Sequence, residues 1–113
     1  MALMTHTTEE AINRSAAILG KFIPGEALGP VEHDTIARVI PDVLAEISKI
    51  VLINEEEIPN IYFETVCRLI AIYAASDFSN TPRDEQGIFD HERRLRYLVA
   101  QSPTYEILAS NYF

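Results

Sequence analysis

The sequence predicts an all-α protein, a small bundle of about four helices with an extended C-terminal tail. Apolar residues recur at three- and four-residue spacing over long stretches, and prolines and glycines separate these stretches. The 113 residues are 48% hydrophobic and 23% charged, which is typical of one globular domain that buries a core without disulfides. We expect a helical domain over residues 1–103 and a separate tail over residues 104–113.

The first helix is expected to open with a capping box. Thr7 and Glu10 have the spacing at which each side chain accepts a hydrogen bond from the other residue's backbone amide. Gly20 weakens the end of this helix, and Pro24-Gly25 is expected to terminate it. Its apolar face comprises Ile12, Ala16, Leu19 and Ile23.

The second helix is expected to begin just after Pro30, near Val31 or Glu32, and to contain Pro41. A proline inside a helix removes one hydrogen bond and clashes with the preceding turn, at a cost of roughly 3 kcal/mol. The apolar pattern continues in phase across Pro41, which favours a kinked helix over two shorter ones. Val51–Ile53 is expected to form a short extended piece. The apolar face comprises Ile36, Val39, Ile40, Val43, Leu44, Ile47, Ile50 and Val51.

The third helix is expected over Pro59–Asp77, with Pro59 at its first position. Apolar residues surround it, and only Glu64 and Arg68 interrupt them, at a spacing that favours an ion pair. Such a helix is central in its domain or is flanked by a neighbouring subunit.

The fourth helix is expected over Pro82–Gln101, with Thr81 as its N-cap and Ser102-Pro103 as its stop. Its core face comprises Ile88, Leu95, Leu98 and Val99, and its second half carries a basic cluster of Arg93, Arg94 and Arg96.

The last ten residues are unusually apolar for a tail. Aromatic side chains anchor interfaces, so this segment is expected to fold back on its own domain or to dock on another chain. The residues expected to dock are Tyr105, Ile107, Leu108, Tyr112 and Phe113.

The charge balance disfavours two classes of binding partner. Nine Lys and Arg face seventeen Asp and Glu, for a net charge of −8. Nucleic-acid binding and adhesion to an anionic membrane both need clustered basic residues. The only cysteine, Cys67, permits no internal disulfide, and the first residues do not have the pattern of a signal peptide, so an intracellular origin is expected.

The sequence carries no recognisable enzyme signature. His33-Asp34 and Asp90–Glu92 lack the spacing of metal ligands on helices, and Cys67 is expected to be a small buried hydrophobic residue. We therefore expect no catalysis, no metal and no cofactor.

The basic cluster has three interpretations. It complements the dipole at the end of its helix, or it contacts nucleic acid weakly, or it forms salt bridges to an acidic surface of another subunit. A candidate acidic surface is the run Glu55, Glu56 and Glu57, which is expected to be a solvated loop.

Several short motifs occur in a familiar order along residues 7–113. They are Ala-x-x-Leu-Gly at 16–20, Pro-Gly-Glu at 24–26, Glu-x-Ile-Pro at 56–59, an aromatic-alanine helix ending at 72–78, Arg-Leu-Arg at 94–96, Pro-Thr-Tyr-Glu at 103–106, and Tyr112-Phe113. In this combination the chain resembles the head-to-tail connector proteins of tailed bacteriophages, also called adaptors or packaged-DNA stabilisation proteins. Pro41 departs from the pattern of a continuous second helix.

The resemblance implies an adaptor ring, dodecameric in such proteins, that sits under the phage portal protein. It implies that the C-terminal tail docks on the portal, that DNA passes through the lumen without specific binding, and that a downstream neck or tail protein docks below. The chain would then reside in the virion neck, and in the host cytoplasm during assembly. No catalysis, cofactor or membrane is implied.

The main alternative is a small acidic helical interaction module, such as an inhibitor or an antitoxin-like partner. A small helical enzyme and a DNA-binding regulator fit the residues less well, for the reasons of chemistry and charge given above.

Overall fold

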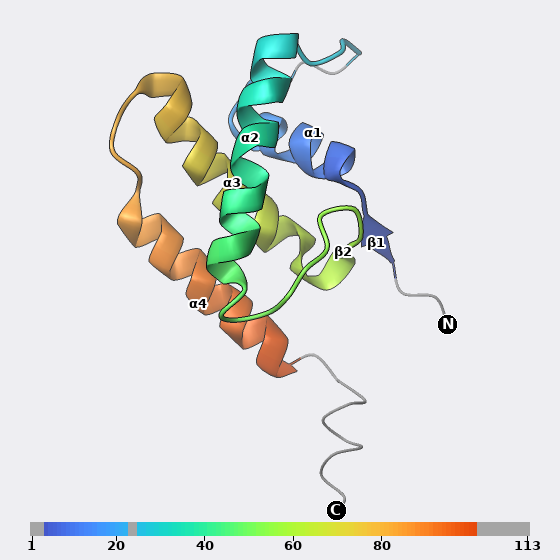
Figure 1. The fold of residues 1–113 in the computed structure, drawn as a ribbon, viewed down its shortest axis with the longest axis vertical. Coiled ribbons are helices and arrows are strands. Elements are labelled where there is room, and N and C mark those ends of the chain that lie inside the picture. The colour runs from blue at the N-terminus through green and yellow to red at the C-terminus, as the bar shows by residue number, and fades with distance from the viewer. Residues whose placement is uncertain (1–3, 23–24, 102–113) are drawn as a thin grey trace, which may run out of the picture.

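The structure is a computed structural model that describes residues 4–22 and 25–101. It confirms the predicted all-α class, because helices account for most of the described residues. Two short strands add an antiparallel pair (Figure 1). The elements are β1 (Thr5–His6), α1 (Thr8–Ile18), α2 (Pro30–Ile47), β2 (Ile58–Pro59), α3 (Asn60–Ser79) and α4 (Glu85–Gln101).

Helix α3 is the centre of the bundle, and it packs against α1, α2 and α4 (Figure 1). This position explains why apolar residues surround it: the other helices of the chain bury most of them, whereas Ile61 near its start is 44% exposed. Of the two interpretations of this helix, the central one is confirmed. Its buried residues are Tyr62, Thr65, Val66, Cys67, Leu69, Ile70, Ala71, Tyr73 and Ala74.

Helix α1 begins with the predicted capping box. The Thr7 N–H donates to Glu10 Oε1 at 2.8 Å, and the Glu10 N–H donates to Thr7 Oγ1 at 3.3 Å. The helix ends at Ile18, so the prediction that it continues to Pro24-Gly25 is wrong. Gly20 ends it instead, because a φ of +75° places this residue in the left-handed region that favours glycine.

Helix α2 is continuous from Pro30 to Ile47, so the alternative of two shorter helices is wrong. Pro41 itself is exposed, whereas Val39, Ile40 and Val43 on either side of it are buried against the core. Burial of this in-phase apolar face offsets the hydrogen bond that the proline removes.

The strand pair was not predicted. Val51–Ile53 forms no strand; the extended residues are Ile58 and Pro59, which pair with Thr5 and His6. The Asn60 N–H extends the contact by donating to the Met4 carbonyl at 2.9 Å. Pro59 is consequently the N-cap of α3 and not its first helical residue.

Helix α4 begins three residues later than predicted, at Glu85. Asp84 caps it: its carbonyl accepts from the Ile88 N–H and its Oδ1 accepts from the Gly87 N–H, both at 3.0 Å. Thr81 is therefore not the N-cap; its hydroxyl lies 2.9 Å from Ser79 Oγ at the end of α3. A carboxylate at the N-terminus also interacts favourably with the helix dipole.

We predict that Asp84→Ala lowers the free energy of unfolding by about 1 kcal/mol, because the first turn of α4 loses its cap. Thr81→Ala is the matched control and should change it by less than about 0.5 kcal/mol. Urea denaturation followed by circular dichroism measures both. Equal losses in the two variants would contradict the observed start of α4.

Candidate interaction surface

Helix α4 divides into a core side and an outer face. Leu95 is fully buried, whereas the opposite side of the helix carries large exposed residues. Phe89 and Tyr97 are 57% and 53% exposed, and Arg93 lies between them at four-residue spacing. We call this side the outer face of α4. It comprises Phe89, Arg93, Arg94, Arg96 and Tyr97, all of them exposed.

Two arginines of this face, Arg93 and Arg94, lie near an aromatic ring and one carboxylate. The Arg94 guanidinium lies 5.3 Å from the centroid of the Tyr97 ring. Asp90, Arg93, Arg94 and Tyr97 line a shallow hollow on the surface. The Asp90 carboxylate accepts a hydrogen bond from Gln86 at 3.0 Å and forms no ion pair with a described arginine.

Two observations separate the interpretations of the basic cluster. The last turn of α4 carries no basic residue, and the dipole effect falls off beyond that turn. Within residues 4–22 and 25–101, Arg93, Arg94 and Arg96 form no ion pair. Among the described residues, no carboxylate therefore neutralises the three arginines through an ion pair.

The acidic loop is a defined turn, and we call Asn54–Glu57 the acidic turn. The Glu57 N–H donates to the Asn54 carbonyl at 3.0 Å, and the Glu56 N–H donates to Asn54 Oδ1 at 2.9 Å. Thr8 of α1 ties the turn down by donating its hydroxyl to the Glu55 carbonyl at 2.7 Å. The three glutamates are exposed, and none forms an ion pair with another described residue.

The structure does not bring the two charged clusters together within one chain. In Figure 1 the acidic turn lies beside β2, away from α4, which runs along another edge of the bundle. The expected docking residues Tyr105, Ile107, Leu108, Tyr112 and Phe113 lie outside the described residues.

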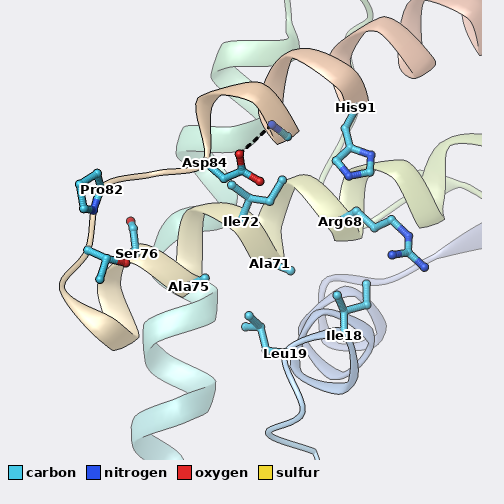
Figure 2. A pocket seen from close by; sticks show the side chains of 12 residues that line it. Ile18, Leu19, Arg68, Ala71, Ile72, Ala75, Ser76, Pro82, Asp84 and His91 are labelled. Atoms are coloured by element: carbon cyan, nitrogen blue, oxygen red, sulfur yellow. Dashed lines mark hydrogen bonds between the residues drawn. The ribbon is translucent and has the colours of Figure 1, made fainter.

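A second surface feature is a hollow of about 400 Å³ between the end of α1, α3 and the start of α4 (Figure 2). Its walls are mainly apolar, with Arg68, Asp84 and His91 among the polar residues that line it. This hollow could not be predicted from the sequence, because its residues come from three different elements of the chain. The apolar residues are Ile18, Leu19, Ala71, Ile72 and Ala75.

The two histidine–carboxylate clusters of the sequence lie in different places. His33 Nε2 lies 2.6 Å from Glu9 Oε1 and connects α2 to α1, whereas His91 lines the hollow. Among the described residues, no group of three or more His, Cys, Asp or Glu side chains is placed to hold a metal ion.

Cys67 is buried, as predicted. Burial raises the pKa of its thiol to about 12, so the nucleophilic thiolate is scarce at neutral pH.

An ion network joins α1 to α3. Arg14 donates to both carboxylate oxygens of Glu64, at 2.9 and 2.8 Å, and Arg68 lies 3.0 Å from the same carboxylate. The Glu64–Arg68 pair was predicted from its spacing, but the Arg14 contact was not. Hydrogen bonds from Arg14 hold the pKa of Glu64 below its usual value.

This lowered pKa predicts a pH-dependent contribution to stability. The contribution is present above the unfolded-state pKa of about 4.3 and is lost as the pH falls through the folded-state value. Because Glu64 and Arg14 are both nearly half exposed, we expect Glu64→Gln to cost only about 0.5 kcal/mol at pH 7. Urea denaturation from pH 7 down to pH 3 should show that the difference in unfolding free energy between wild type and Glu64→Gln vanishes in acid. Glu56→Gln, which breaks no ion pair with another described residue, is the control. A difference between wild type and Glu64→Gln that persists in acid would contradict the assignment.

None of the described helices is long and apolar enough to cross a membrane. Comparison of the chain with models of protein families, with curated proteins and with solved structures gives no match.

Proposed function

We propose that the chain is a structural protein of the virion neck, an adaptor ring that docks on the phage portal and extends the DNA channel toward the tail. The observation that carries this proposal is the outer face of α4, where three arginines lie among two exposed aromatic side chains. Arginine and aromatic residues are enriched at protein interfaces and dominate their binding energy. The order of motifs that resembles head-to-tail connectors supports the same conclusion.

Neighbouring copies form the ring in this proposal, as in the dodecameric rings of the family. Glu55, Glu56 and Glu57 of one copy supply negative charge, and Arg93, Arg94 and Arg96 of another supply positive charge. Both clusters are exposed in the single chain, which is what an inter-subunit contact requires.

The acidity of the chain suits a DNA conduit. Residues 1–60 hold ten acidic and four basic residues, whereas residues 61–113 hold seven and five. A channel wall of negative charge repels phosphates and lets the duplex slide, whereas clustered Lys and Arg would hold it. DNA therefore passes through the lumen without specific binding.

The tail over residues 104–113 is the proposed contact with the portal. Five of its ten side chains are large and apolar, and a groove on a partner can bury them. The opposite side of the ring offers a platform for a downstream neck or tail protein. The role needs no catalysis and no cofactor.

We predict that deleting residues 104–113 abolishes co-sedimentation with the portal protein of the same phage. The helical circular dichroism should remain, because the core cluster lies within the described residues 11–95. The double substitution of Tyr112→Ser and Phe113→Ser should weaken binding at least tenfold, as expected when interface anchors are lost. Val31→Ser, at an exposed apolar position of α2, is the matched control.

Undiminished portal binding by the truncated chain would contradict the role of the tail. A one-to-one complex with a target unrelated to phage assembly would instead favour the alternative of a small acidic interaction module.

A further inference from the structure

We infer that the outer face of α4 in one copy binds the acidic turn of the next copy, with Leu52 covering the exposed aromatic rings. This contact would be the one that joins neighbouring copies in the proposed ring. It rests on the proposed function only for closure of the ring.

The charges of the two surfaces are complementary. The outer face of α4 carries three arginines, and the acidic turn carries three glutamates, with no ion pair to a described residue on either side. Such complementarity orients two surfaces and suppresses wrong partners. Arg93 and Arg94 border the hollow on this face together with Asp90, so a carboxylate placed there meets two guanidinium groups and one carboxylate, a net positive site.

The apolar residues of the two surfaces also match. Leu52 is 83% exposed and lies two residues before the acidic turn, so the same segment of the chain carries an exposed apolar side chain and the three carboxylates. Phe89 and Tyr97 flank Arg93 on the opposing face and supply the apolar surface that Leu52 can cover. Exclusion of water by these side chains strengthens the ion pairs next to them.

Both surfaces are built before they meet. Asn54 closes the acidic turn through two backbone amides, and Thr8 anchors it to α1. The arginines project from a helix that packs on α3 through Leu95. Little backbone entropy is therefore lost on association.

In Figure 1 the acidic turn lies beside β2, whereas α4 runs along another edge of the bundle. In the proposed ring the contact is head-to-tail: each copy uses its α4 on one neighbour and offers its acidic turn to the next. Contacts of this kind propagate from copy to copy and close into a ring when the rotation between copies allows.

A charge exchange between two variants of the full chain tests the contact. One variant carries Arg93→Glu and Arg94→Glu, and the other carries Glu55→Arg and Glu56→Arg. Sedimentation equilibrium at low salt should show that wild-type protein self-associates and that each variant alone does so at least about tenfold more weakly. An equimolar mixture should associate again, because both kinds of contact then join opposite charges.

Two controls accompany this experiment. Arg38→Glu removes an exposed arginine of α2 and should leave self-association unchanged. Wild-type association should weaken as salt is raised, since exposed charges are screened.

Three results would overturn the contact: a wild-type chain that stays monomeric at low salt, variants that associate as wild type does, or a mixture that fails to associate. Portal co-sedimentation of the wild-type chain is read separately. If the mixture of variants associates again but the wild-type chain does not bind the portal, the contact is supported and the adaptor role is contradicted. If the wild-type chain binds the portal but the mixture fails to associate, the adaptor role is supported and the contact is contradicted.

Discussion

Burial of α3 is the constraint on which the rest of the structure depends. A helix with apolar residues on nearly every side is stable in water only if other elements cover most of those sides. Here α1, α2 and α4 supply most of the cover, and the fully buried Val66, Cys67 and Ile70 belong to the core cluster they form. Each of the three surrounding helices packs one face against α3.

The surface follows from that arrangement. Because α4 packs on α3 through Leu95, its opposite side has to be exposed, and that side carries Arg93 between Phe89 and Tyr97. A solvated helix face is ordinarily polar, so exposed aromatic rings among arginines indicate a contact surface. The acidic turn lies beside β2 and carries the opposite charge, which is the basis of the proposed contact between identical copies.

The sequence predicts well whatever depends on periodicity or on neighbours along the chain. The capping box at Thr7 and Glu10 is local, and the apolar pattern across Pro41 identifies one helix face even though a proline interrupts it. The sequence indicates that Gly20 weakens α1. It does not show that Gly20 adopts the left-handed backbone conformation that ends the helix, because the spacing of apolar residues carries no information on a backbone angle.

Contacts between distant segments were the part that could not be predicted. Thr81 and Asp84 both suit an N-cap, and the choice of Asp84 depends on where the connection from α3 delivers the chain. The two-residue strands are too short to show a period, and the ion pair of Arg14 with Glu64 joins positions fifty residues apart. The sequence shows the arginine cluster and the glutamate run as charged segments. It does not show that the folded chain keeps the two apart.

The most direct test of the adaptor role is a cryo-EM map of the full chain bound to the portal. The account predicts a closed ring of copies, with the outer face of α4 of each copy against residues 52–57 of the next and residues 104–113 seated on the portal. A single bound copy, or a ring in which the outer face of α4 is exposed to solvent, would contradict it.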